Sequence, residues 1–146
     1  MKVVSIIIIC IVVNCNHMFA QDYQNLSVTE IREVLTLAIN LPELQQYYHY
    51  VKDDDSRNQL IIKEYGLINP KNMKGVSKFE KEILVLSQTE INNRKVKRYL
   101  NVGDWSAVND KLRLQLNYSA EGLTINYLFE KKNGSWNLVK SSIYEE

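Results

Sequence analysis

The chain has 146 residues, a formal net charge of +1 at pH 7 and 45% hydrophobic residues. This length suits one domain with its own core, and the near-zero charge argues against binding nucleic acid, which needs a clustered positive field. Both cysteines, Cys10 and Cys15, lie close to the N-terminus. A domain that begins after them must fold without a disulfide or a thiolate metal site.

The N-terminal segment predicts a signal peptide covering residues 1–20. Lys2 supplies the positive start, and Val3–Val13 is an apolar run too short to span a bilayer comfortably. Ala20 provides the small residue expected before the cleavage site. We therefore expect a secreted or periplasmic protein, with residues 21–146 forming a single domain that has no membrane span after cleavage.

Two alternatives to simple cleavage stay open at this stage. The segment could remain as an uncleaved anchor. The chain could also be lipid-anchored at Cys15, although Val12, Val13 and Asn14 are a poor match to the small residues that precede a lipidated cysteine.

Two helical segments are predicted next. Ser27 and Glu30 have the spacing of a capping box, in which each side chain accepts a hydrogen bond from the other residue's backbone. Apolar residues then recur at helical spacing as far as Ile39. Pro42 fits the first turn of a second helix, whose apolar stripe comprises Leu44, Tyr47, Tyr48 and Val51.

The middle of the chain predicts short strands separated by loops. Residues 59–65 and 83–87 are apolar enough for strands, and residues 66–75 carry the Pro and Gly typical of a loop. The spacing of Val76, Phe79 and Ile83 favours a short helix over residues 76–82. We expect residues 88–93 to be a polar connection and residues 94–102 to be a strand that ends at Gly103.

The clearest pattern in the chain is Lys111–Tyr144. Apolar residues occupy every second position in two successive runs, which is the period of a half-buried strand. Asn133-Gly134 separates the second run from a third, and this pair is the strongest short signal for a β-hairpin. The sequence therefore predicts an α+β fold with N-terminal helices packed on a curved antiparallel sheet that ends in a three-strand meander.

The C-terminal stretch resembles a known family. In Glu121–Val139, an alternating strand turns at Asn133-Gly134 and restarts at Trp136, which is similar to the last hairpin of NTF2-like proteins. Leu41–Leu44 and Tyr47–His49 add to this likeness, which extends to small secreted bacterial proteins with the NTF2-like or cystatin-like fold. The resemblance implies a helix packed in a curved antiparallel sheet, but it does not imply a chemistry.

The same resemblance narrows the possible activities. Cystatin protease inhibitors use a Gln-x-Val-x-Gly hairpin, which this chain lacks. NTF2-like enzymes pair acids and histidines inside the cone of the sheet, and His49 is the one histidine beyond the predicted signal peptide. If residues 49–53 are helical, His49 and Asp53 lie one turn apart and form the candidate catalytic pair.

Metal and ligand sites have weaker signals. Asp53–Asp55 lack the glycine and spacing of a calcium loop, so a solvated acidic loop is expected, with no metal and no cofactor. Aromatic residues could line a pocket if the sheet curves over the helix, or they could form an ordinary core. The candidate ligand-binding residues are Tyr47, Tyr48, Tyr127 and Trp136.

These patterns lead to two hypotheses about function. The first is a non-enzymatic secreted or periplasmic binding or interaction module, whose partner is an unknown protein or small molecule. The alternative is a small-ligand-binding or enzymatic NTF2-like protein with a cone pocket near His49. A homodimer formed through the sheet is compatible with either hypothesis.

Overall fold

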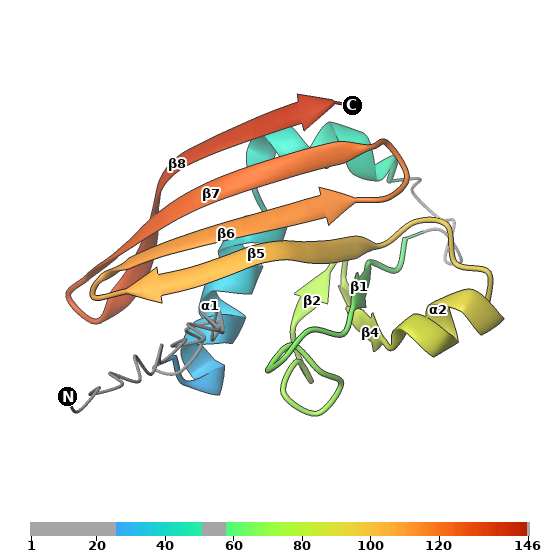
Figure 1. Cartoon of the computed structure of the whole chain (residues 1–146), viewed down its shortest axis with the longest axis horizontal. Coiled ribbons are helices and arrows are strands. Elements are labelled where there is room, and N and C mark those ends of the chain that lie inside the picture. The colour runs from blue at the N-terminus through green and yellow to red at the C-terminus, as the bar shows by residue number, and fades with distance from the viewer. Residues whose placement is uncertain (1–25, 51–57, 146) are drawn as a thin grey trace, which may run out of the picture.

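The computed structural model describes residues 26–50 and 58–145, which form an α+β fold (Figure 1). The predicted signal peptide, Cys15 and Asp53 lie outside the described residues. The main sheet has 6 strands in the order β4-β1-β5-β6-β7-β8. The strands are β1 (Ile61–Lys63), β4 (Leu84–Leu86), β5 (Leu100–Val108), β6 (Lys111–Tyr118), β7 (Leu123–Lys132) and β8 (Ser135–Glu145).

The sheet is mixed rather than wholly antiparallel. Strands β5 to β8 form an antiparallel meander, but β1 pairs in parallel with β4 on one side and with β5 on the other. The expectation of an antiparallel sheet is therefore wrong for β1 and β4. Each of these strands has only 3 residues, which is too few for a sequence pattern that would reveal its direction.

The predicted three-strand meander is confirmed. In β6 and β7, every second residue is buried, from Leu112 to Tyr118 and from Leu123 to Phe129. Asn133 and Gly134 both have positive φ, at 52° and 83°, as a two-residue hairpin turn requires. The buried residues of these strands share the face that packs on the helices, which we call the inner face; the opposite face is the outer face.

Gly103 does not end a strand, contrary to the prediction. It is the extra residue of a β-bulge, because Val102 pairs with Leu116 while Asp104 pairs with Gln115. The bulge shifts the alternation of β5 by one residue, so that Val102 and Trp105 are both buried. Residues 94–99, which were predicted as the start of this strand, precede it.

A tight hairpin replaces the short helix predicted over residues 76–82. Strands β2 (Ser77–Lys78) and β3 (Lys81–Glu82) pair as an antiparallel two-stranded sheet. Phe79 and Glu80 form its turn with φ of 54° and 63°, a left-handed conformation that is strained for side chains of this kind. Neither residue is a turn former, so the sequence gives no signal for this hairpin.

A second helix, α2 (Gln88–Asn93), lies where a polar connection was predicted. Ser87 caps it by accepting from the Glu90 N–H group, and the Glu90 carboxylate accepts from the Ser87 backbone at 2.9 Å. This is the same capping box that correctly predicted the first helix. The capping-box pattern occurs at both sites. Residues 88–93 contain too few apolar residues to show a helical period, so the second helix was not predicted.

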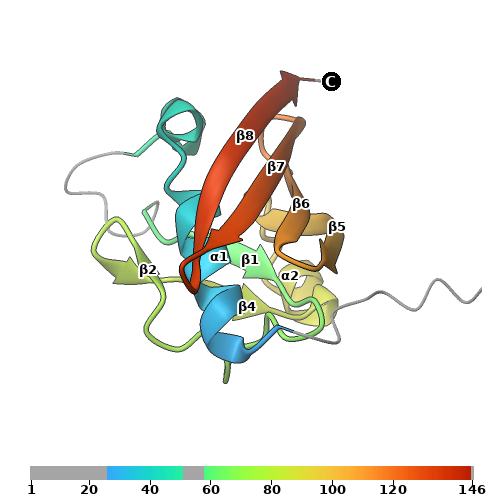
Figure 2. The same cartoon turned by 90° about the vertical axis from the view of Figure 1, so that its left-hand side faces the viewer.

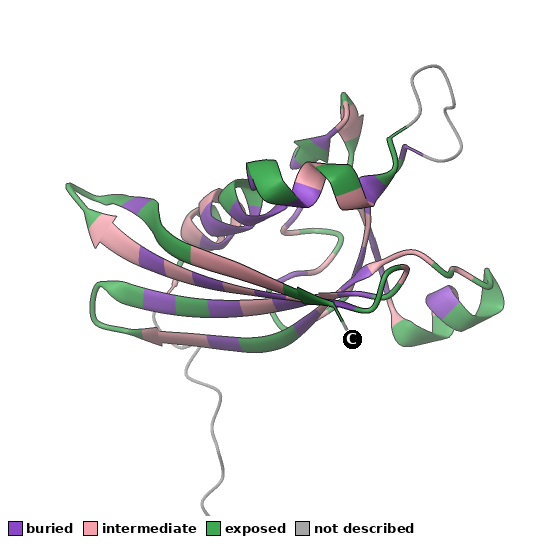
Figure 3. Ribbon diagram, turned by 90° about the horizontal axis from the view of Figure 1, so that it is seen from above, coloured by how far each residue is buried: buried purple, intermediate pink, exposed green. Residues whose placement is uncertain are grey.

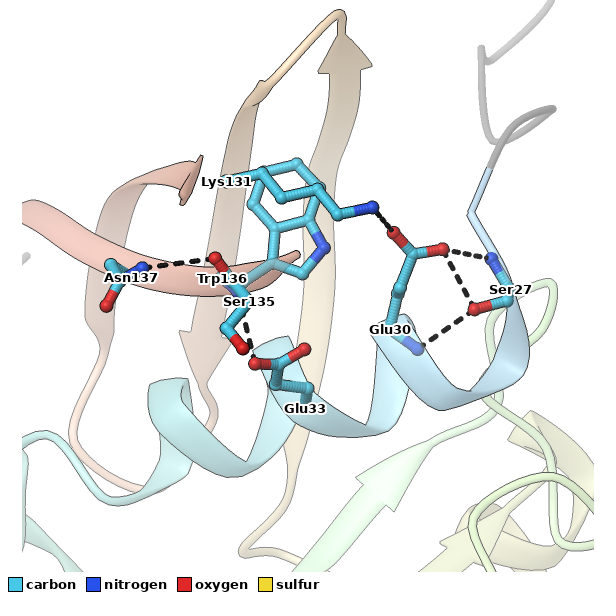
Figure 4. Close-up of polar contacts among 7 residues, drawn as sticks. All are labelled: Ser27, Glu30, Glu33, Lys131, Ser135, Trp136 and Asn137. Carbon is cyan, nitrogen blue, oxygen red and sulfur yellow. Dashed lines mark hydrogen bonds and ion pairs between the residues drawn. The ribbon is translucent and has the colours of Figure 1, made fainter. Parts of the chain in front are cut away.

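Helix α1 (Val28–Ile39) begins with the predicted capping box. The Glu30 carboxylate accepts from the Ser27 backbone at 2.9 Å and from Lys131 Nζ at 2.7 Å (Figure 4). The neighbouring Glu33 accepts from the Trp136 backbone at 3.1 Å. These bonds attach the first turns of α1 to the β7–β8 hairpin.

Helix α1 and the following 3-10 helix, η1 (Pro42–Tyr48), lie on the inner face of the long strands (Figure 2). The buried side of α1 faces the sheet, and its exposed side faces away (Figure 3). Two tyrosine hydroxyls bind the carboxyl end of α1: Tyr127 donates to the Ala38 carbonyl at 3.1 Å, and Tyr48 donates to the Ile39 carbonyl at 3.2 Å. Each carbonyl also has a second donor, because the Leu41 N–H donates to the Ala38 carbonyl at 3.3 Å and Gln45 Nε2 donates to the Ile39 carbonyl at 3.4 Å.

We predict that Glu30 makes folding stability sensitive to acid. The Lys131 hydrogen bond and the Ser27 backbone lower the pKa of Glu30 from 4.5 to about 2. Because the folded-state pKa is the lower one, the stabilisation is complete above pH 4.5 and is lost as pH falls toward 2. Urea unfolding of the Glu30→Gln variant should show reduced stability at neutral pH and a weaker loss in acid. Glu43→Gln, at an exposed carboxylate, is the control; equal acid sensitivity in all three proteins would contradict this role of Glu30.

Candidate functional site

The space between helix and sheet is a packed core. Tyr48, Tyr127 and Trp136 are only 4%, 3% and 3% exposed and belong to one cluster with the apolar residues of α1. Burial raises the pKa of the Tyr48 and Tyr127 hydroxyls, so both remain protonated donors to α1. The hydroxyl of Tyr47, the remaining aromatic candidate, donates to Glu145 Oε1 at 2.8 Å.

His49 lies at the rim of the fold. Its Nε2 atom is 2.8 Å from Glu121 Oε1, and its side chain is 55% exposed. The helix needed to place His49 and Asp53 one turn apart ends at Tyr48, because His49 adopts a left-handed conformation with φ of 48°. Asp53 itself lies outside the described residues, and none of the cavities described below is lined by His49.

Lys78 is a buried cation beside the core. Its Nζ atom donates to Asn40 Oδ1 at 2.8 Å and also to Gln45 Oε1. The same atom lies 4.8 Å from the centre of the Phe79 ring, and burial lowers the pKa of the lysine. These contacts hold the β2–β3 hairpin against the end of α1, so we assign Lys78 a structural role.

The outer face of the meander is the surface that the described helices leave uncovered (Figure 1). Strand pairing aligns its side chains in rows that cross β5, β6, β7 and β8. Two neighbouring rows, which we call the amide rows, are rich in carboxamides and hydroxyls. The first comprises Asn101, Asn117, Thr124 and Tyr144; the second comprises Asp104, Gln115, Asn126 and Ser142.

The outer face is also hollowed. A cavity of about 550 Å³ lies over the amide rows between β5 and β7, and its lining includes Asn101, Gln115, Asn117 and Thr124. A cavity of about 380 Å³ continues along β6 to β8, where Asn126 and Ser142 contribute. A third, of about 640 Å³, lies at the charged end of the same face near Arg113 and Glu130. These volumes fall within the range of small-molecule sites.

Hydrogen bonds fix the orientation of the amide rows. Gln115 Nε2 donates to Asn126 Oδ1 at 3.1 Å, and Thr124 Oγ1 donates to Asn117 Oδ1 at 3.0 Å. Side chains held by such bonds lose less conformational freedom when a ligand binds. Within the described part of the chain, no hydrogen bond uses the Nδ2 groups of Asn117 and Asn126, so both donors are available on the surface.

Gly103 makes room for these side chains. A Cβ atom at this position would lie 2.7 Å from Asn117 Nδ2 and would also collide with Gln115 Oε1. The carboxamides of Gln115 and Asn117 therefore extend across the backbone of β5, where any other residue would project. The same glycine that shifts the strand register thus leaves room for two side chains that line the cavity.

Ser119, in the connection between β6 and β7, fixes a wall of the cavity that lies between β5 and β7. Ser119 Oγ accepts from the Tyr99 N–H at 3.0 Å and donates to the Lys97 carbonyl at 2.8 Å. The Ser119 N–H donates to the Tyr99 carbonyl at 3.0 Å. Tyr99 therefore has a fixed backbone beside Asn101, and both residues line the cavity.

Comparison with known proteins adds no functional information: no family model, no curated protein and no solved structure matches this chain. The resemblance to NTF2-like and cystatin-like proteins therefore stays a prediction. Among residues 26–50 and 58–145, no helix has the length and apolar character needed to cross a membrane. The same residues contain no group of three or more His, Cys, Asp and Glu side chains suited to a metal ion.

Sequence reasoning did not select the amide rows. Asn117, Thr124 and Asn126 occupy the polar positions of alternating strands, and such positions are usually solvated. Their signal was a lack of charge: the outer-face positions of 115–126 are amides and a threonine where Lys or Glu is the common choice. Without the cross-strand register, these residues cannot be recognised as one surface.

We predict that Gly103→Ala disturbs the outer face more than the core. The added methyl group displaces the ends of flexible side chains, so the free energy of unfolding should fall by no more than about 1.5 kcal/mol. The NMR signals of the Gln115, Asn117 and Asn126 side-chain amides should shift. Gly66→Ala is the contrasting control, because Gly66 has φ of +55° and nothing within 4 Å: it should destabilise through backbone strain alone. Unchanged amide signals in Gly103→Ala would contradict the close packing of these carboxamides on Gly103.

Proposed function

We propose that the protein is a non-enzymatic binding module that binds its ligand on the outer face of the β5–β8 meander. The observation that carries this proposal is the position of the cavities. Three cavities of about 380 to 640 Å³ lie on the uncovered face, whereas packed aromatic residues fill the space under the helix. A preformed concave surface with fixed polar groups is typical of a ligand site.

The amide rows have the composition of a recognition surface. Asn, Ser, Gly and Tyr supply adaptable hydrogen bonding and rigid contact area in the binding loops of antibodies, and the same residue types line the cavity over β5 to β7. No nucleophile with a neighbouring base is present among the residues that line the three cavities. The surface therefore supports binding better than covalent chemistry.

The enzymatic alternative would place a ligand in a cone pocket near His49. The His49–Glu121 pair could support acid–base chemistry, since a carboxylate orients a histidine ring. However, this pair is exposed, and the ring of Tyr48, next to His49 in the chain, packs in the core against Tyr118, with ring centres 5.7 Å apart. The outer face is the better supported site.

The predicted location of the protein is part of this proposal. The N-terminal sequence supports secretion or a periplasmic location by a cleaved signal peptide, and lipid attachment at Cys15 is the alternative. The NTF2-like or cystatin-like architecture is also proposed, on the basis of a helix packed against one face of the meander.

The position of the ligand can be tested by NMR with a library of small fragments that includes neutral, acidic and basic compounds. We expect hits to shift signals of Asn101, Asn117 and Thr124, and we expect Gly103→Ala to weaken those shifts. His49→Ala is the matched variant for the alternative site; it should alter neither ligand binding nor stability by more than about 1 kcal/mol, because the His49–Glu121 pair is exposed. Hits that cluster around His49 or Trp136 and disappear in His49→Ala would favour the alternative.

We also propose that the predicted homodimer forms through β8, which is an edge strand of the sheet. An exposed edge offers unpaired backbone groups to a second strand, and β8 carries the exposed hydrophobic residues Leu138, Val139 and Tyr144. Antiparallel pairing of two β8 strands is self-complementary, as a two-fold dimer requires.

We predict that Val139→Lys weakens this dimer. The new charge would lie on the edge where the second copy pairs. Val108→Lys is the matched control, because Val108 is equally exposed, at 60% against 55%, but lies on β5. Light scattering after size-exclusion chromatography should show a dimer for the unmodified protein and for Val108→Lys, and a monomer for Val139→Lys. A monomer in all three cases would exclude the dimer.

A further inference from the structure

The chemistry of the amide rows restricts the ligand. Seven of their eight side chains are neutral. The single charged residue is Asp104, which lies on β5 at one end of the second row. The charged residues of the outer face lie in the neighbouring rows, which contain Arg113, Lys140, Lys111 and Glu130. A ligand over the amide rows therefore meets hydrogen-bonding groups without a dominant charge.

These groups offer donors and acceptors together. A carboxamide has two N–H donors and a carbonyl acceptor, and a hydroxyl group both donates and accepts. In the rows, Asn117 Oδ1 and Asn126 Oδ1 are already used by Thr124 and Gln115, which directs their Nδ2 groups to other partners. Gln115 Oε1, beside Gly103, remains an acceptor. Mixed donors and acceptors of this kind are matched by ligand hydroxyls.

We propose that the amide rows bind a neutral polyhydroxylated ligand, namely an uncharged oligosaccharide that lies across the strands. This inference rests on the proposed function and names its ligand class. Neighbouring strands are about 4.8 Å apart, so the row from Asn101 to Tyr144 extends about 14 Å. That length accommodates an extended ligand with more than one sugar ring.

Aromatic residues lie at both ends of the first amide row. Tyr99 lines the cavity beside Asn101, and Tyr144, which is 58% exposed, pairs with Thr124 at the far side. A tyrosine ring offers an apolar face together with a polar hydroxyl. A sugar has the complementary pair of surfaces, since its C–H groups are apolar and its hydroxyls are polar.

Other ligand classes fit the rows less well. Phosphate, sulfate or carboxylate groups are bound by Arg, Lys or helix N-termini, and neither amide row contains a cation. An extended peptide binds by adding a strand to a sheet edge, through backbone groups. On the outer face, the backbone groups are already paired between strands, so side chains alone are available.

The test is a titration of the isotope-labelled protein with uncharged trisaccharides built from glucose or from N-acetylglucosamine, followed by NMR. Triglutamate, trilysine and a sulfated trisaccharide are the comparison ligands. We expect an uncharged trisaccharide to shift the side-chain amides of Gln115, Asn117 and Asn126, with an affinity that changes little with salt because no ion pair forms. Asn117→Ala should weaken binding about tenfold, the effect of one lost hydrogen bond.

Asn137→Ala is the matched control, because Asn137 pairs with Glu130 outside the amide rows and bonds to the Ser135 carbonyl at 3.1 Å. This variant should retain full affinity. Failure of every uncharged trisaccharide to bind, or equal affinity in both variants, would overturn the inference. If a peptide or an anionic ligand shifts the amide-row signals instead, the ligand class is wrong while the proposed binding face stands. If ligands shift only signals near His49, both proposals fail.

Discussion

Two hydrogen bonds at the carboxyl end of α1 connect the helix to the buried aromatic residues of the sheet side. The hydroxyls of Tyr48 and Tyr127 reach the last carbonyls of the helix from η1 and from β7. Each hydrogen bond links a buried ring to the helix backbone and adds to the apolar packing that keeps both rings between helix and sheet. The interior is filled by aromatic residues in the place where a cone-shaped pocket would lie, which is why we propose the opposite face for binding.

The parts of the fold that follow local rules were predictable. Alternating residues and Asn133-Gly134 identified β6, β7 and β8, and Ser27 with Glu30 identified the start of α1. The predictions failed where a tertiary contact overrides the local preference. Phe79 and Glu80 turn a hairpin in a strained conformation because Phe79 packs against the ring of Tyr48, 5.5 Å away. Gly103 looked like a strand break because a bulge and a break share the same residue type.

The site was less predictable than the fold. The sequence offered two roles for Tyr48, Tyr127 and Trp136, as ligand-binding residues or as core residues. An aromatic side chain suits both roles, and only its burial in the structure distinguishes one role from the other. Gln115 and Asn117 share a face by the alternation of β6, but they join Asn101 and Asn126 in one surface only through the register of β5, β6 and β7. That register depends on the bulge at Gly103, which is invisible to a pattern of alternation.

The mixed sheet has a consequence for the order of folding. Strands β5 to β8 are joined by short turns, so their contacts close small loops and form quickly. Strand β1 must instead meet β4 and β5 across long intervening segments, and such non-local pairings are slow. We therefore expect the meander, with its amide rows, to form first and to serve as the template on which the parallel strands assemble.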